Sequence, residues 1–206
     1  MAMNVQTSQR NSTFLPEQPF VLDFHSARLT DEQFEELCRN NRDLKFEVSA
    51  RGELIIVPPT SPESGYRNSD LTYEIVKWSK HDKTGIVFDS STLFTFPNGA
   101  KRSPDVSWMT LEKWNKVSPT ERRKFSRVVP DFVIELLSPT DSLIDAIEKM
   151  AEYIDNGVRL GWLIDPIGRN VHVYRASGVV EELENPAWLD GEDVLCGFRL
   201  DVREIW

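Results

Sequence analysis

The run PDFVIELL at residues 130–137 constrains the fold more than any other part of the sequence. Five of the six residues from Phe132 to Leu137 are apolar, with no alternation between apolar and polar positions. A short continuous apolar run is typical of a strand that is covered on both faces of its sheet. The segment DSLIDAIEKMAEYIDNG then has an apolar stripe at helical spacing, formed by Leu143, Ile147, Met150 and Ile154. With RLGWLID as the next strand, this order predicts a sheet with helices packed against it.

Hairpins and further helices are expected on the N-terminal side of this unit. Thr30 and Gln33 have the spacing of a capping box and start one helix. The stretches LKFEVS and ELIIV predict a hairpin, and a second helix is expected from residue 65 to 81. Together these elements predict an α/β (α+β) fold with a mixed β-sheet core flanked by helices.

The length and the cysteine usage limit the class of protein. A chain of 206 residues is expected to form a tail and lead-in over 1–28 and a single domain over 29–206. No apolar run approaches the ~18 residues of a membrane span, and the polar start has no signal-peptide core. Cys38 and Cys196 are far apart, which favours a reduced, cytoplasmic protein. The three histidines are also scattered, so zinc is not expected.

The charge balance limits how the chain could meet nucleic acid. The net charge of -9 argues against a general nucleic-acid coat, because phosphate binding is largely electrostatic. It leaves room for an enzyme with a local basic surface and an acidic, metal-binding centre. The segment ERRKFSR at residues 121–127 holds four basic residues, which predict either a solvated helix face or a contact with phosphates.

Three carboxylates and one lysine are the candidate site residues. Glu135 lies inside the buried run, Asp105 follows Pro104 at the start of a strand, and Glu47 lies within LKFEVS. Lys149 lies on the helix that follows Glu135. Converging carboxylates are the ligands that Mg²⁺ prefers, and a carboxylate-bound ion can activate water against a phosphodiester. A nearby lysine could orient that water or stabilise developing charge.

Each of these residues also has a purely structural interpretation. Glu135 could pair with a structural Arg or Lys, because buried charges need partners. Asp105 could belong to a turn, and Glu47 could face solvent on an amphipathic strand. Lys149 has Asp145 four residues earlier, which predicts an exposed ion pair on the helix. Helical side chains point back toward the N-terminus, however, so the long lysine side chain could also reach the end of the Glu135 strand.

Taken in order, several stretches of the chain resemble the Uma-two family of restriction endonucleases, within the PD-(D/E)XK nuclease superfamily. The resemblance covers roughly residues 29 to 202. It rests on the order and spacing of FEVSARGELIIVPPTSP, SPDVSWM, PDFVIELLSPTDS, EKMAEYIDNGVRLGWLIDP and GEDVLCGF.

The resemblance implies a restriction-endonuclease-like mixed β-sheet core flanked by helices and a divalent-metal phosphodiesterase site. Asp105 matches the Asp of the PD motif, and Glu135 matches the first acid of (D/E)XK. Glu47 matches an acidic residue of an early strand. The superfamily lysine belongs two residues after the acid, where this chain has Leu137, and Lys149 matches a lysine that the family carries in the next helix. By analogy with related nucleases that cut two strands, the resemblance also implies a homodimer.

Three classes of function follow from these residues. The first is a Mg²⁺-dependent endonuclease, with Mn²⁺ as an alternative ion, that hydrolyses phosphodiester bonds of DNA. In it Asp105 and Glu135 hold the metal and Glu47 binds a second ion or a water. Lys149 then positions the attacking water. The second class is a catalytically inactive nuclease-fold module for binding or assembly, which Leu137 and the net charge favour. The third is a glycosidase with two catalytic acids, for which no aromatic sugar platform is evident.

Overall fold

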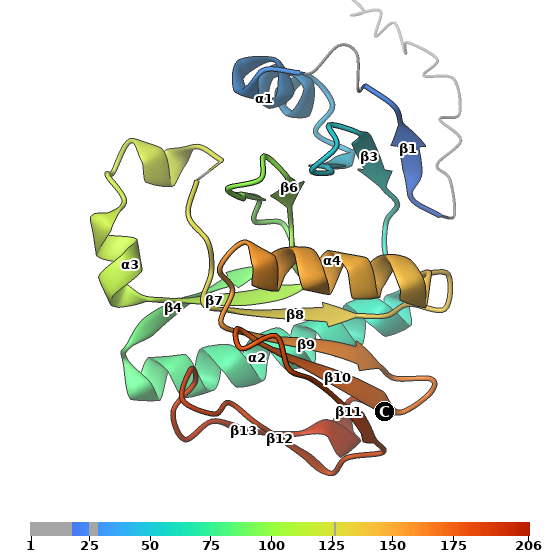
Figure 1. The fold of residues 1–206 in the computed structure, drawn as a ribbon, viewed down its shortest axis with the longest axis vertical. Coiled ribbons are helices and arrows are strands. Elements are labelled where there is room, and N and C mark those ends of the chain that lie inside the picture. The colour runs from blue at the N-terminus through green and yellow to red at the C-terminus, as the bar shows by residue number, and fades with distance from the viewer. Residues whose placement is uncertain (1–17, 25–28, 126) are drawn as a thin grey trace, which may run out of the picture.

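The core of the protein is a six-stranded mixed sheet (Figure 1). The computed structural model describes residues 18–24, 29–125 and 127–206. In sheet order the strands are β11 (Val180–Glu184), β10 (Asn170–Arg175), β9 (Leu160–Asp165), β8 (Phe132–Leu136), β7 (Val106–Thr110) and β4 (Gly85–Asp89). Strands β8 and β9 are parallel, whereas the other neighbouring pairs are antiparallel. The predicted mixed sheet is therefore confirmed.

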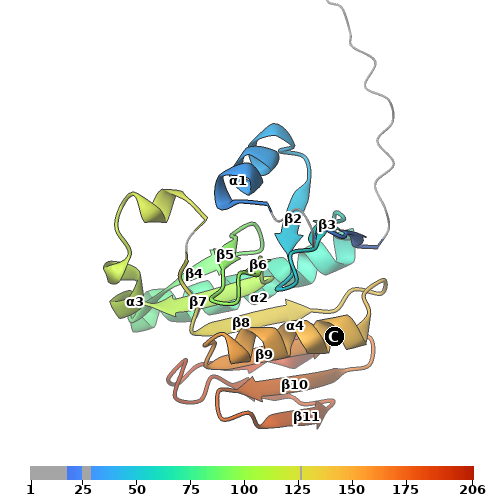
Figure 2. The same ribbon diagram turned by 45° about the horizontal axis from the view of Figure 1, so that its top comes forward.

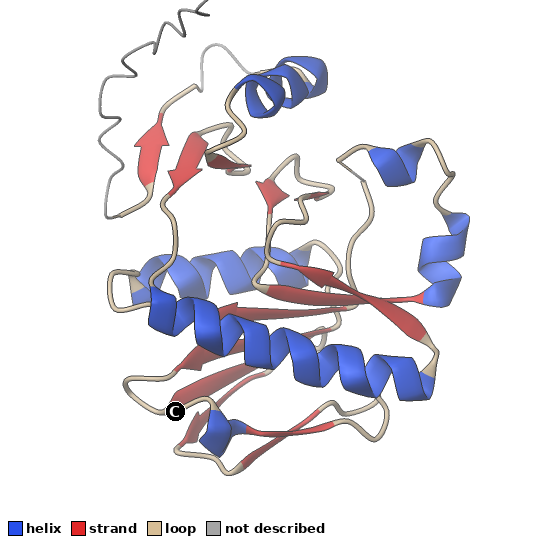
Figure 3. Cartoon of the chain, turned by 180° about the vertical axis from the view of Figure 1, so that it is seen from behind, coloured by secondary structure: helices blue, strands red, loops and turns tan. Residues whose placement is uncertain are grey.

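Two helices cover the opposite faces of this sheet. Figures 1 and 3 view the molecule from opposite sides and show α4 (Leu143–Asp155) in front in one and α2 (Pro62–Asp82) in front in the other. Side chains of β8 alternate between the two layers. Phe132 and Ile134 pack in the cluster that contains the buried α2 residues, and Val133 packs in the cluster that contains those of α4. This alternation places Glu135 on the α4 face.

A smaller sheet covers the part of the α4 face that the helix leaves open. Its strands are β1 (Phe20–Leu22), β3 (Leu54–Val57), β2 (Lys45–Val48), β6 (Lys101–Arg102) and β5 (Phe94–Thr95). Figure 2 shows β2, β5 and β6 next to β7 and β8. Phe94, Phe96 and Ala100 share a buried cluster with Val133 and Tyr153, so the two sheets are packed together.

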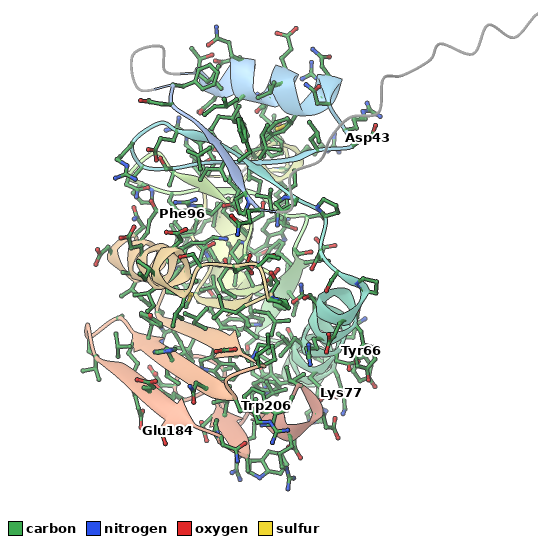
Figure 4. All side chains as sticks on the ribbon, turned by 90° about the vertical axis from the view of Figure 1, so that its right-hand side faces the viewer. Asp43, Tyr66, Lys77, Phe96, Glu184 and Trp206 are labelled. Carbon is green, nitrogen blue, oxygen red and sulfur yellow. The ribbon has the colours of Figure 1, made fainter. Side chains whose placement is uncertain are left out.

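The remaining elements lie around these two sheets. They are α1 (Asp31–Asn40), α3 (Leu111–Lys116), the 3-10 helices η1 (Glu121–Arg123) and η2 (Val202–Glu204), and the hairpin of β12 (Trp188–Asp190) and β13 (Arg199–Asp201). Figure 4 shows Tyr66 and Lys77 on the outward side of α2, away from the core. In the described part of the chain, no helix is both long and apolar enough to cross a bilayer.

Most of the predicted elements are present, with differences that have physical causes. The capping box of Thr30 and Gln33 and the hairpin of β2 and β3 are confirmed. The second helix starts at Pro62 instead of residue 65, because Ser61 caps it. The region predicted as an irregular lead-in supplies β1, which pairs with β3. Residues 1–17 and 25–28 of the predicted tail and lead-in lie outside the described residues.

The predicted helix at α4 is confirmed, but its predicted buried face is wrong in the first half. Leu143 is 42% and Ile147 36% exposed, whereas Met150 and Tyr153 are fully buried. Together with the half-buried Lys149, these two define the inward face. The apolar stripe therefore predicts the inward face of α4 incorrectly in this half of the helix. In the structure Lys149 points toward the sheet and not toward solvent.

Candidate active site

Glu135 and Lys149 form an ion pair between β8 and α4. The Lys149 Nζ atom lies 2.9 Å from Glu135 Oε1, and the Tyr153 hydroxyl donates a 2.7 Å hydrogen bond to the same oxygen. Tyr153 is one helical turn after Lys149, so both side chains come down from one face of α4. The exposed pair with Asp145 that the sequence allowed is not the one that Lys149 makes. The lysine reaches the end of the Glu135 strand.

Glu47 lies in β2 and is only 3% exposed. Its Oε1 accepts a 3.0 Å hydrogen bond from the Ser103 amide and lies 3.4 Å from Lys149 Nζ, and its Oε2 lies 3.3 Å from the Arg102 guanidinium. Burial alone would raise the pKa of Glu47, but the charges of Lys149 and Arg102 outweigh it and lower the pKa to about 2. Glu47 is therefore a permanent anion in the folded protein and faces inward, not toward solvent.

Arg102 connects this pair to a further carboxylate. Its Nε donates a 2.7 Å hydrogen bond to Glu152 of α4, and its side chain is 12% exposed. Charges thus alternate in space from Glu152 through Arg102, Glu47 and Lys149 to Glu135. Burying these ions costs desolvation energy that only complete pairing offsets. These ion pairs connect α4 to the small sheet and the small sheet back to α4, and they hold Lys149 between Glu47 and Glu135.

Asp105 lies at the same end of β8 as Glu135. Val106 of β7 is paired with Ile134 of β8 in the register of the two strands. Because the strands are antiparallel, the next residues on each, Asp105 and Glu135, are also side by side. The Leu136 amide donates a 2.9 Å hydrogen bond to Asp105 Oδ2, and the Asn68 side-chain amide donates a 3.2 Å bond to Oδ1. Burial raises the pKa of Asp105 despite the Leu136 hydrogen bond. Two like charges next to each other on a sheet are unfavourable, and a bound cation would relieve this.

The protonation of Glu135 depends on this crowding. Burial raises its pKa to about 7, because the nearby charges of Asp105 and Glu47 add to the effect and Lys149 only partly opposes it. The pKa of Lys149 is raised, since Glu135 and Glu47 outweigh its burial. The lysine therefore stays protonated at neutral pH and is a donor, not a base. At neutral pH Glu135 is therefore partly protonated, and the binding of a cation would displace that proton.

The residues present fit a hard divalent cation with few protein ligands. Among residues 18–24, 29–125 and 127–206, no three His, Cys, Asp or Glu side chains form one ready metal-binding group. Mg²⁺ is commonly bound by one or two carboxylates with water and substrate phosphate, and Asp105 and Glu135 supply that number. Lys149 and Tyr153 both contact Oε1 of Glu135, which leaves Oε2 for another ligand. The prediction that Glu47 binds a second ion stays a prediction, although the contacts of both its oxygens are with amide and cationic groups.

Sequence reasoning did not find Arg102, Tyr153 or Asn68. Tyr153 could have been found, because it is four residues after Lys149 on the same helical face. Arg102 is three residues before Asp105, but only the pairing of β2 with β6 brings it to Glu47. Asn68 comes from α2, whose approach to Asp105 is a tertiary contact that no local pattern encodes.

The basic segment at residues 121–127 is partly occupied by protein contacts. The Arg122 guanidinium donates hydrogen bonds to the carbonyls of Val117 and Trp114 and stacks 4.5 Å from the Trp114 ring. Arg127 pairs with Asp31 at 2.5 Å. Arg123 is exposed on η1. Of these arginines, Arg123 is the better placed to meet a phosphate.

Comparisons with known proteins agree with this architecture. The model of the Uma2 family, described as "Putative restriction endonuclease", matches residues 31–203. Among solved structures, the crystal structure of a putative nuclease belonging to DUF820 from Anabaena variabilis superposes with a TM-score of 0.71. The two chains are 22% identical, and the match covers 86% of this chain and 97% of that one, which shows a shared fold. Comparison with curated proteins found no match. Since the family model covers most of its length, the chain belongs to the Uma2 family of restriction-endonuclease-like proteins.

Proposed function

We propose that the protein is an endonuclease that hydrolyses phosphodiester bonds of DNA with Mg²⁺, or Mn²⁺ in its place. The observation that carries this proposal is the position of Lys149. The strand position where the superfamily places its lysine holds Leu137, yet a lysine ammonium lies 2.9 Å from Glu135 by way of α4. Two carboxylates and a lysine thus lie near one another, which supports assigning them to a PD-(D/E)XK centre.

Each residue has a distinct role in the proposed reaction. Asp105 and Glu135 would hold the cation, which when bound supplies charge neutralisation at the phosphate and acidifies water. Lys149 would donate a hydrogen bond that orients the attacking water, whose oxygen forms the new bond to phosphorus as the bond to the leaving oxygen breaks. The attacking water gives up a proton to solvent, and the leaving oxygen takes a proton from solvent. Glu47 keeps Lys149 protonated and in place. The Tyr153 hydroxyl holds Oε1 of Glu135.

Cleavage of supercoiled plasmid DNA tests the proposal. Wild-type protein should nick or cut the plasmid with Mg²⁺ or Mn²⁺ and not with EDTA, and Glu135→Gln should abolish cutting. Glu148→Gln is the matched control, because Glu148 is an exposed carboxylate on α4. Equal cutting by wild type and Glu135→Gln would point to a contaminating nuclease and refute the proposal.

The competing function is a nuclease-fold module that binds or assembles without cutting. The ion pair of Lys149 and Glu135 favours it, because the lysine already occupies Oε1 of Glu135 without any metal. Lys149→Met separates the two functions. The substitution should abolish cutting while Mn²⁺ still binds if the protein is a nuclease. A cytoplasmic location and a homodimer remain predictions, and analytical ultracentrifugation with and without DNA would test the latter.

A further inference from the structure

The helix α2 brings one polar side chain to the candidate metal ligands. The Nδ2 atom of Asn68 donates a 3.2 Å hydrogen bond to Asp105 Oδ1. An ionised carboxylate only accepts hydrogen bonds, so the amide must present its NH₂ group to Asp105 and direct its oxygen elsewhere. This contact limits the orientation of the Asp105 carboxylate, which the Leu136 amide holds from the other side.

The other half of the same amide has no partner. Among the described residues, Asn68 Oδ1 is one of four buried side-chain atoms that make no hydrogen bond. An unsatisfied buried carbonyl oxygen costs about 1 to 3 kcal/mol, so in a native protein it usually marks the place of a water or an ion. The other three atoms belong to Ser107, Trp162 and Trp206, and none of these is a side chain that contacts Asp105.

Asn68 also lies close to the surface of the protein. It lines a surface cavity of about 460 Å³ whose wall includes Thr60, Ser69, Thr72 and Tyr73. Its Oδ1 is nevertheless buried. Asn68 therefore borders this cavity, holds Asp105 through its NH₂ group and keeps one buried acceptor without a partner.

We infer that Asn68 is a positioning residue of the metal centre, a role that rests on the proposed function. Its NH₂ group fixes Asp105, and its Oδ1 accepts a hydrogen bond from a water bound to the divalent cation. Groups that orient metal ligands in this way contribute roughly 10- to 100-fold to metal affinity. Because Asn68 comes from α2, it would couple the metal to the face of the sheet opposite α4.

Isothermal titration of the metal-free full chain with Mn²⁺ tests this role without any activity measurement. Asn68→Ala should raise the Kd for Mn²⁺ roughly 10- to 100-fold. Asn68→Asp should bind Mn²⁺ more tightly than wild type near pH 8, because it places an anionic oxygen where the amide oxygen now lies. Ser69→Ala is the matched control, since Ser69 lines the same cavity and its hydroxyl donates a hydrogen bond to the Gly65 carbonyl of its own helix. It should leave the Kd unchanged.

The outcomes distinguish this inference from the proposed function. If wild type binds Mn²⁺ and Asn68→Ala binds it equally well, the inference is refuted and the proposed function is unaffected. If wild type binds no Mn²⁺, both are refuted. Should Asn68→Ala fail to fold, Asn68→Asp decides, because a folding defect cannot tighten binding near pH 8. Unchanged or weaker binding by Asn68→Asp at that pH would overturn the inference.

Discussion

Replacing Glu135 with glutamine should stabilise the metal-free protein at alkaline pH. The pKa of Glu135 is about 7 in the folded state, against an ordinary value of 4.5. Between these two values the folded protein binds more protons than the unfolded chain, so the free energy of unfolding of wild type falls as pH rises. Glutamine has no proton to lose and keeps an acceptor for Tyr153 and Lys149. At 1.36 kcal/mol per pKa unit, Glu135→Gln gains about 2 to 3 kcal/mol over wild type between pH 5 and pH 8.

Urea unfolding followed by tryptophan fluorescence measures this difference directly. Both proteins are unfolded in EDTA at several pH values, and the buried Trp108 and Trp162 report the transition. Glu148→Gln, which removes an exposed carboxylate from α4, controls for the change in net charge. A second series with Mg²⁺ should raise the stability of wild type most at pH 8 and leave Glu135→Gln unchanged, because the cation needs the ionised carboxylate.

A parallel pH dependence for wild type and Glu135→Gln would refute this reasoning. It would mean that Lys149 fully compensates the burial of Glu135 and that the carboxylate is an ordinary member of a structural ion pair. Ionised Glu135 would then not destabilise the metal-free protein, and a cation would have no such destabilisation to relieve. A higher free energy of unfolding for Glu135→Gln at alkaline pH would instead mean that wild type keeps a carboxylate that lowers its own stability, as is common at functional sites.

The remaining predictions concern the charges around Glu135. Glu47→Gln should destabilise the protein by about 3 kcal/mol near pH 7 and progressively less as pH falls from 4.5 toward 2. The reason is that Glu47, whose pKa is lowered in the folded protein, stabilises the fold only while it is ionised. Acid titration of both proteins followed by circular dichroism measures this difference. Lys149→Ala should lower the free energy of unfolding by roughly 3 to 5 kcal/mol in urea melts, since it leaves two buried carboxylates without their shared cation. Arg123→Ala should reduce the salt slope of DNA binding by about one, whereas Arg122→Ala should lower the melting temperature and leave that slope unchanged. Fluorescence anisotropy of labelled DNA from low to high salt measures the slopes. Equal slopes for wild type and Arg123→Ala would exclude a phosphate contact by Arg123.

The fold could be predicted largely from local patterns, because apolar periodicity and capping chemistry act over a few residues. The apolar run at β8 and the capping box at Thr30 each correspond to an element of the structure. What could not be predicted was the pairing of strands distant in sequence. The stretch GIVFDSSTLFTF at residues 85–96 contains two strands, of which β4 joins the large sheet and β5 the small one. No periodicity in that stretch distinguishes the two destinations.

The candidate site shows the same division between local and distant information. Glu135 could be identified because a carboxylate in a buried run is locally exceptional. The orientation of Lys149 could not, because the apolar stripe of α4 indicated a different inward face. That stripe includes Leu143 and Ile147, which are largely exposed in the structure. Helical periodicity assumes that apolar residues mark the core, and it fails where a helix turns a lysine inward to pair with buried carboxylates.

Packing explains why the lysine comes from the helix and not from the strand. Position 137 follows Glu135 by two residues, so its side chain lies on the same face of the sheet. Leu137 is 9% exposed and belongs to the cluster that joins the small sheet to α4. A lysine there would put an ammonium group into the apolar layer that holds the two sheets together. Delivered from α4, the same group lies between Glu135 and Glu47, where both sheets meet and two carboxylates compensate its charge. The small sheet thus supplies, through Glu47, part of the counter-charge that holds this lysine between the two sheets.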